Sequence, residues 1–225
     1  MDYRVISIGT LSHNHVWGES GAVRTSHATT TLVEAGEQRI LVDPSLPEAA
    51  LAARFNERTG KTLSAVTDVF CTTLRPVHRR ALEALAQANW WVMEEELESY
   101  RDHLAHLRES AQRLSADDAR QLEAELKLLQ KFKPAPETLA PQVQLYPLKG
   151  ASVGSAGLLL TPAMQTVLIA GDAAITADHV QRGQIWEGCA DTQQAMETLE
   201  DILQVADIII PGHDNIMLSP KGQMF

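Results

Sequence analysis

The stretch Val69-Phe-Cys-Thr-Thr-Leu-Arg-Pro-Val-His78-Arg-Arg decides the fold of this chain. It begins within an apolar run from Ala65 to Cys71, which is typical of a buried strand. The run breaks at Pro76 and passes into a helical pattern from His78 to Ala88. A strand that ends just before a helix is a common place for a binding site in an α/β layer fold. The residues after Cys71 are therefore the first candidates for a functional site.

The composition is that of an ordinary globular domain. The chain has 225 residues, of which 44% are hydrophobic, so we predict a single domain over residues 1–225. The net charge of −10 disfavours nucleic acid and anionic membranes as partners. No apolar run approaches the length of a membrane span, and the N-terminus lacks the layout of a signal peptide. Cys71 and Cys189 form no C-x-x-C motif, so we expect reduced thiols and a cytoplasmic location.

The segments before the opening stretch predict strands, a polar loop and a helix. We expect strands at Tyr3–Ile8, Thr29–Glu34 and Arg39–Val42, and a helix at Pro47–Gly60. The segment Gly9–Ser26 is rich in Gly, Ser, His and Asn and predicts a loop or flap that contains His13 and His15, with His27 just after it. Two interpretations of these three histidines are equally good: they are exposed to solvent, or they belong to a flap that folds over a site.

A helical hairpin is predicted between Glu94 and Lys131, after a short apolar run at Trp90–Met93. Its apolar residues alternate at spacings of three and four, as in a helical seam. They are Leu97, Tyr100, Leu104, Leu107, Ala111 and Leu114, followed by Ala119, Leu122, Leu126 and Leu129. Ser115-Ala-Asp-Asp118 resembles a capping box and predicts the start of the second helix. The seam must be covered by the main domain or by a second copy, and we expect a homodimer because two-fold symmetry lets one seam cover its copy.

The second half predicts further strands, each followed by a short polar or glycine-containing motif. The expected elements are strands at Val143–Tyr146, Gly157–Thr161, Thr166–Ala170 and Asp207–Pro211, and a helix at Thr192–Val205. The motifs are Gly150-Ala-Ser-Val-Gly-Ser155, Gly171-Asp172 and Gly212-His213-Asp214.

Taken in order, these motifs resemble those of the metallo-β-lactamase superfamily, which carries T-H-x-H-x-D-H, G-H-x-x-G-S, G-D and a terminal G-H. The first motif here reads Thr72-Thr-Leu-Arg-Pro-Val-His78. The early strand pair also ends in Asp43, which matches a family carboxylate that supports the site without binding metal, although capping of a strand or helix end explains it equally well. The resemblance covers nearly the whole chain except the hairpin. It implies an α/β fold, a four-layer αβ/βα sandwich of two mixed sheets, with one sheet from each half of the chain.

The resemblance also implies two adjacent metal sites, of which this chain retains the ligands of one. The first site takes three histidines in the family, and the equivalent residues here are Thr73, Arg75 and Ala151. The second site keeps three of its four ligand residues, which are His78, Asp172 and His213. Val77 stands in the position of the fourth. Two histidines and a carboxylate suffice for one divalent ion with open positions. We therefore expect one metal, with zinc first and iron or manganese as alternatives, or none.

Arg75 is the substitution with the largest chemical consequence. An arginine keeps its proton in proteins, so a fixed positive charge stands where a metal ligand stands in the family. We expect its guanidinium to point into the vacated first site and to pair with Asp172, replacing the charge of the missing metal. The alternative is that Arg75 binds an anionic group of a substrate. Arg75 and Asp172 are accordingly the candidate catalytic residues.

The sequence favours a catalytically impaired, ligand-binding protein of this fold with at most one metal. The alternative is a single-metal hydrolase of an ester, lactone or phosphoester, so whether the chain is an enzyme stays open. A third hypothesis gives the hairpin a structural or interaction role. The expected partner is a small-molecule ligand or substrate that the sequence does not identify. His179 joins the three loop histidines as a residue that either reaches the site or is structural, and we interpret His103 and His106 as surface residues.

Overall fold

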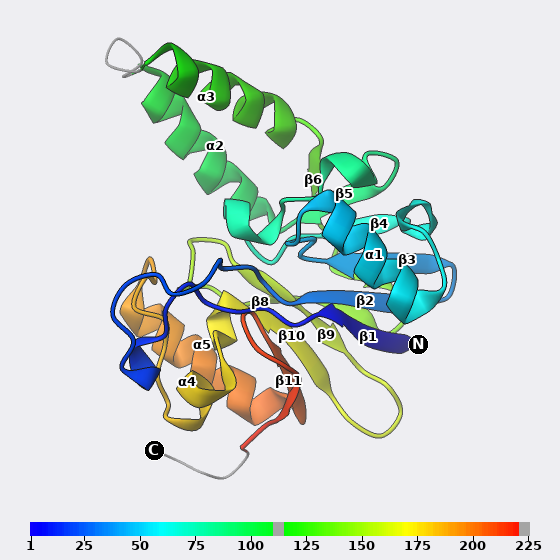
Figure 1. Cartoon of the computed structure of the whole chain (residues 1–225). Helices are drawn as coiled ribbons and strands as arrows, with labels where there is room; N and C mark the ends of the chain where they lie inside the picture. The colour runs from blue at the N-terminus through cyan, green and yellow to red at the C-terminus, as the bar shows by residue number, and fades with distance from the viewer. Residues whose placement is uncertain (110–114, 221–225) are drawn as a thin grey trace.

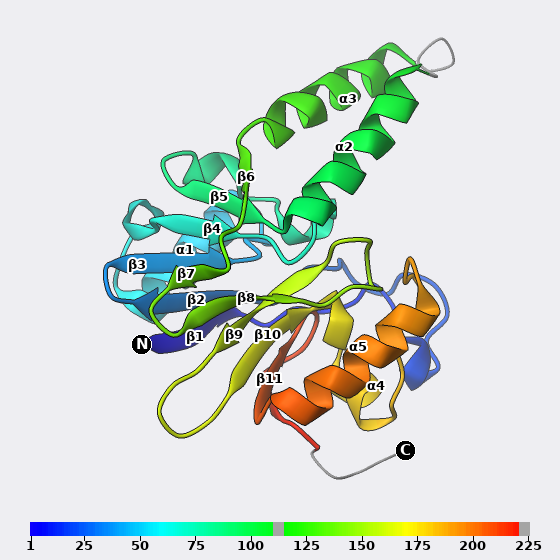
Figure 2. The same ribbon diagram turned by 180° about the vertical axis from the view of Figure 1, so that it is seen from behind.

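The computed structural model describes residues 1–109 and 115–220 and shows two mixed six-stranded sheets that face each other (Figures 1 and 2). Residues 2–134 supply the strands of the first sheet, and residues 138–218 supply those of the second. Helices cover the outer faces, so the four-layer αβ/βα sandwich and the division of the sheets between the two halves of the chain are confirmed.

The first sheet has the order β1-β2-β3-β4-β5-β6. Its strands are β1 Asp2–Ser7, β2 Thr30–Ala35, β3 Gln38–Val42, β4 Asp68–Phe70, β5 Asn89–Val92 and β6 Phe132–Pro134. Strands β1, β2 and β3 pair antiparallel, and β3 to β6 pair parallel, so β3 has one neighbour of each kind. Helix α1, Glu48–Thr59, connects β3 to the segment that leads into β4 and buries Leu51 and Phe55 against the outer face.

The second sheet has the order β12-β11-β10-β9-β8-β7. Its strands are β7 Thr138–Ala140, β8 Val143–Pro147, β9 Ala156–Leu160, β10 Val167–Gly171, β11 Ile208–Pro211 and β12 Met217–Leu218. Only β10 and β11 run parallel, and the long connection between them contains α4, Ala177–Gln181, and α5, Thr192–Val205. The carboxyl ends of these two parallel strands therefore lie side by side at one edge of the sandwich.

Among the described residues, three apolar clusters hold the layers together. The inner cluster joins the facing sides of the two sheets through fully buried side chains such as Val42 and Phe70 from the first sheet and Leu158 from the second. One outer cluster packs helices on the first sheet, and the other packs α5 on the second sheet through Leu199 and Ile202. Burial of this kind stabilises the sandwich by about 25 cal/mol per Å² of apolar surface. No helix in the described residues is long and apolar enough to cross a membrane.

The predicted helical hairpin is present as α2, Glu94–Glu109, and α3, Ala116–Leu129, and it projects from the sandwich (Figure 1). Ser115 and Asp118 form the capping box that the sequence indicates. Four seam leucines are buried in the same cluster as Trp90 and Phe132 of the first sheet: Leu97, Leu104, Leu122 and Leu129. The predicted seam residues Ala111 and Leu114 lie outside the described residues.

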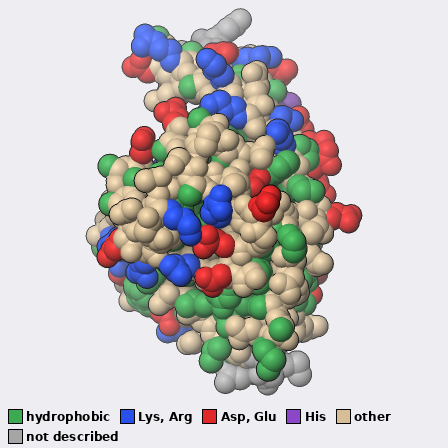
Figure 3. Space-filling view, turned by 90° about the vertical axis from the view of Figure 1, so that its right-hand side faces the viewer, with side chains coloured by type: hydrophobic (Ala, Val, Ile, Leu, Met, Phe, Trp, Pro, Cys, Tyr) green, Lys and Arg blue, Asp and Glu red, His purple; other side chains and the backbone are tan. Residues whose placement is uncertain are grey.

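These four leucines are covered within the chain, whereas the predicted seam residue Leu107 is 40% exposed and faces solvent, so the prediction is wrong at that position. Coverage within the chain removes the main argument for the homodimer, which itself stays a prediction. On the face seen in Figure 3, the projecting hairpin carries Lys, Arg, Asp and Glu side chains with scattered hydrophobic ones.

The predicted helix from His78 to Ala88 is wrong. The segment instead forms two short 3-10 turns, Pro76–His78 and Glu83–Leu85. The amide of Ala81 donates to the carbonyl of Pro44, so an α-helical bond at that amide is replaced by a tertiary one. The predicted strand Ala65–Cys71 is also shorter, because only Asp68–Phe70 pairs with both neighbouring strands.

Replacing Leu104 with Ala tests whether the seam is covered within the chain. Leu104 is 4% exposed, whereas Leu107 on the same helix is 40% exposed. We expect Leu104→Ala to lower the free energy of unfolding by about 2–4 kcal/mol and Leu107→Ala to lower it by less than about 1 kcal/mol. Urea denaturation of the two variants measures both values. Equal small losses would show that the seam is not part of the core.

Candidate metal centre

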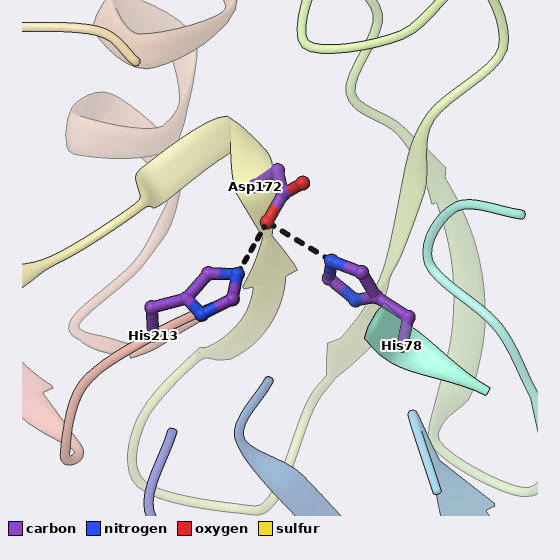
Figure 4. Close-up of side chains that lie close together, drawn as sticks. All are labelled: His78, Asp172 and His213. Carbon is purple, nitrogen blue, oxygen red and sulfur yellow. Dashed lines mark hydrogen bonds and ion pairs between the residues drawn. The ribbon is translucent and has the colours of Figure 1, made fainter. Parts of the chain in front are cut away.

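Three side chains from distant parts of the chain meet at one edge of the sandwich (Figure 4). His78 ends the turn after β4, Asp172 follows β10 directly, and His213 follows β11. The Oδ1 atom of Asp172 lies 3.1 Å from Nε2 of His78 and 3.2 Å from Nε2 of His213. All three residues are buried, and their donor atoms lie within 4.8 Å of one another. The convergence expected from the sequence is therefore present.

Each histidine is held from behind by an acceptor. Nδ1 of His78 lies 3.0 Å from Oδ2 of Asp43, and Nδ1 of His213 lies 3.1 Å from the carbonyl oxygen of Thr10. Asp43 is itself fixed, because its carboxylate accepts hydrogen bonds from the amide and the hydroxyl of Thr72. Its φ of 49° is a conformation that residues other than glycine seldom adopt. The structure thus places Asp43 directly behind His78, where it turns Nε2 toward Asp172.

Arg75 occupies the other side of Asp172. Its Nη1 donates to Oδ2 of Asp172 at 2.7 Å, and its Nη2 donates to the carbonyl oxygens of Ala151 at 2.5 Å and Gly188 at 3.3 Å. The guanidinium carbon lies 4.1 Å from the ring centre of Trp186. The Arg75 side chain is 25% exposed, and that of Asp172 is 3% exposed. The guanidinium therefore points into the site and pairs with Asp172, as the sequence predicts.

The remaining replaced positions supply no metal donors. The hydroxyl of Thr73 donates to Glu96 at 2.6 Å, and Ala151 contributes only its carbonyl oxygen, which Arg75 uses. Val77 offers an apolar side chain to the pocket beside Asp172. The first of the two metal sites implied by the resemblance thus has no ligand among these residues.

The neighbouring charged groups shift the pKa values of both His78 and Asp172. Burial lowers the pKa of His78, but the carboxylates of Asp172 and Asp43 outweigh it and raise that pKa to about 10. Burial raises the pKa of Asp172, but His78 and His213 outweigh it and hold that pKa well below its usual range. Without a bound ion, the positive charges of His78 and Arg75 therefore face the negative charges of Asp43 and Asp172.

The donor set also fits one divalent ion. Ligands of a tetrahedral zinc ion at bond lengths of about 2.0–2.1 Å lie about 3.3 Å apart. The separations of 3.1 and 3.2 Å between Asp172 Oδ1 and the two Nε2 atoms are close to that value. Acceptors behind both Nδ1 atoms give the arrangement that orients metal-binding histidines. Binding would displace a proton from His78, because only a neutral imidazole binds metal.

A pocket of about 130 Å³ opens beside the cluster. Its lining includes Arg75, Asp172 and His213 together with Trp186 and Glu187. Among the residues that line it, Trp186 could not be found from the sequence, because a single aromatic residue in a loop has no distinguishing pattern.

The loop histidines divide between the pocket and the scaffold. His13 and His15 line the pocket and lie 3.6 and 3.4 Å from Oε1 of Glu187, so the flap does reach the site's rim. His27 instead places Nε2 3.0 Å from the carbonyl oxygen of Ile8. His179 is buried against the ring of His15, and burial lowers its pKa to about 4. Neither His27 nor His179 joins the group formed by His78, Asp172 and His213.

Comparison with solved structures relates this geometry to known proteins, whereas no family model and no curated protein sequence matches the chain. A Thermotoga maritima protein that is assigned to the metallo-β-lactamases has a TM-score of 0.70 and 16% identity over 96% of this chain and 98% of its own. The dizinc quorum-quenching lactonase AidC has a TM-score of 0.66 and 16% identity over 88% of this chain and 80% of its own. A mutant of AiiA from B. thuringiensis, with N-decanoyl-L-homoserine bound at its active site, has a TM-score of 0.64 and 18% identity over 94% of this chain and 92% of its own.

The chain therefore has the metallo-β-lactamase fold, and the solved structures that share this fold include hydrolases. At identities of 16–18% the likeness establishes the fold, and the chemistry of this chain has to be argued from its own residues.

Replacing Arg75 with Ala tests the pairing with Asp172. We expect the free energy of unfolding of chelator-treated protein to fall by roughly 1–3 kcal/mol, because a buried carboxylate loses a charged donor. Arg54→Ala removes an exposed arginine that pairs with Glu57 and should change stability by less than about 0.5 kcal/mol. An Arg75→Ala protein that melts at the wild-type temperature would show that the pair contributes nothing.

The raised pKa of His78 predicts a pH dependence for chelator-treated protein. Because the folded-state pKa of about 10 lies above the unfolded value of 6.5, the contribution of His78 is complete below pH 6.5 and is lost as pH rises through 10. Urea denaturation at pH values of about 6, 7.5 and 9 should show this decline. His78→Gln should flatten it, whereas His106→Gln should leave it unchanged. An equal slope in all three proteins would refute the assignment.

Proposed function

We propose that this chain binds one divalent metal ion at His78, Asp172 and His213 and a small-molecule ligand in the adjoining pocket, with Arg75 in place of the second cation. Zinc is the first candidate for the ion, with iron and manganese as alternatives. The observation that carries the proposal is the division of Asp172: one carboxylate oxygen faces two imidazole nitrogens, and the other accepts from Arg75.

The division explains why one metal is proposed rather than two. A carboxylate can bridge two cations with one oxygen to each, and here a guanidinium already takes the second oxygen. The positive charge of Arg75 also repels a metal ion at the neighbouring position. Relative to a two-metal hydrolase, the chain is therefore proposed to be catalytically impaired and to act mainly in ligand binding.

The pocket beside the cluster contains the groups that would contact a ligand. A bound divalent ion would polarise a carbonyl or phosphoryl oxygen of the ligand. Within residues 1–109 and 115–220, the structure gives Nε of Arg75 no acceptor, so this N–H is free to donate to a ligand oxygen. The ring of Trp186 covers one face of the guanidinium and limits its movement. A volume of about 130 Å³ suits a small polar group rather than a large ligand.

A single-metal hydrolase of an ester, lactone or phosphoester is the second candidate. The observation that favours it is that Asp172, His213 and Arg75 all line the same pocket, so a substrate oxygen could approach the metal position and the guanidinium together. One metal with three protein ligands and an open position is a common catalytic arrangement.

Metal analysis of protein purified without chelator tests the proposal. We expect about one equivalent of metal per chain, as one complete donor set requires. The ion should be lost in His213→Ala and kept in His106→Ala, which changes an exposed histidine on α2. Two equivalents, no tightly bound metal after incubation with zinc, or one equivalent that survives in His213→Ala would contradict the proposal.

Hydrolysis assays then separate the two candidates. The metal-loaded protein is assayed with 4-nitrophenyl acetate, γ-butyrolactone and bis(4-nitrophenyl) phosphate. The ligand-binding proposal predicts no turnover above that of the His213→Ala protein. Turnover that requires both the metal and His213 would favour the hydrolase instead. A cytoplasmic location and a homodimer stay predictions, and light scattering in solution tests the second.

A further inference from the structure

Glu96, in the first turn of α2, is a buried carboxylate that the proposed function does not use. It is 5% exposed, although glutamate is seldom buried without a charged partner. Among the described residues, no Lys, Arg or His forms an ion pair with it; the neighbouring Glu95, by contrast, pairs with Lys149 at the surface. Hydrogen bonds and the helix N-terminus must therefore stabilise the charge of Glu96.

Four donors from two separate loops satisfy this carboxylate. Oε1 accepts from the hydroxyl of Thr73 at 2.6 Å and from the amide of Leu74 at 2.9 Å. Oε2 accepts from the hydroxyl of Ser152 at 2.7 Å and from the amide of Gly154 at 3.1 Å. Each oxygen thus holds one loop, and the side chain bridges the two.

Both loops serve Arg75. The first, residues 73–74, directly precedes Arg75 in the chain and sets where its side chain begins. The second, residues 152–154, directly follows Ala151, whose carbonyl oxygen accepts from Nη2 of Arg75 at 2.5 Å. Glu96 therefore fixes the start of the arginine side chain and one of the acceptors that hold its far end.

The close approach of the second loop to α2 supports the same conclusion independently. A Cβ atom at Gly154 would lie 2.1 Å from the amide nitrogen of Glu96 and 2.5 Å from the carbonyl carbon of Glu95. Only glycine allows the loop backbone to contact the helix at this distance. Packing and hydrogen bonding thus join the hairpin to the loop that positions Arg75.

We propose that Glu96 is a positioning residue that aims Arg75 at Asp172, so that the first turn of the inserted hairpin is part of the site. Glu96 accepts a hydrogen bond from the hydroxyl of Thr73, which stands where the resemblance implies the first histidine ligand of the lost metal site. The hairpin thereby stabilises the arrangement in which a guanidinium takes the place of a metal ion. The inference rests on the proposed function for the role of Arg75, but its geometry does not require that metal binds.

A double-mutant cycle between Glu96 and Arg75 tests this inference in the presence of chelator, so that failure of metal binding does not affect the result. Glu96→Gln should lower the melting temperature by about 5 °C, as loss of buried acceptors predicts for a chain of this size. In the Arg75→Ala background, Glu96→Gln should lower the melting temperature by less than about two-thirds of its effect in the wild-type protein, because part of the effect of Glu96 acts through Arg75. The matched control, Glu95→Gln, should have the same small effect in both backgrounds.

A spectroscopic readout reports the position of Arg75 directly. The Nε–H resonance of Arg75, assigned by its loss in Arg75→Ala, should shift or broaden in Glu96→Gln and stay in place in Glu95→Gln. If Glu96→Gln does not fold, Thr73→Val removes one of the four donors and should shift the same resonance. Additive melting effects, or a resonance unmoved by both Glu96→Gln and Thr73→Val, would overturn the proposal.

Discussion

The site depends on how the carboxylate of Asp172 is shared. The sequence brings this residue to the end of a fully buried strand, where an unpaired charge would be costly. One oxygen meets the imidazoles of His78 and His213, and the other meets the guanidinium of Arg75. Positive charge therefore surrounds Asp172 on two sides. We propose that one side exchanges a proton for a metal ion, whereas the other holds a cation that cannot leave.

The rest of the structure keeps these groups in place. Asp43 and a backbone carbonyl orient the two histidines, while backbone carbonyls and the Trp186 ring hold Arg75. The two sheets bring the strand ends together because β10 and β11 run parallel and the inner apolar cluster fixes the first sheet against them. A fold that the dizinc lactonase AidC also has is thus proposed to persist here with one metal ion, since the scaffold supports each group separately.

Much of this could be predicted from the sequence. Motifs in the order of the metallo-β-lactamase superfamily implied the sandwich by resemblance, and the same resemblance implied that His78, Asp172 and His213 share one site. Local pattern failed where tertiary bonds decide, as at Ala81, whose amide bonds to another segment in place of a helical partner. It also offered no signal for Glu96, because this residue is one of three consecutive glutamates at a helix start and only the folded loops distinguish it. The seam pattern was right for the four buried leucines and wrong for the exposed Leu107, and periodicity alone does not say whether a seam is covered within the chain.

The central claim is that Arg75 replaces one cation at Asp172 and leaves room for one metal ion. Anomalous X-ray diffraction at the zinc edge, from crystals grown with zinc, tests it most directly. The account predicts a single peak bounded by His78, Asp172 and His213, with the guanidinium of Arg75 still on Oδ2 of Asp172. Two peaks, or one peak at the position of a displaced Arg75 side chain, would contradict it.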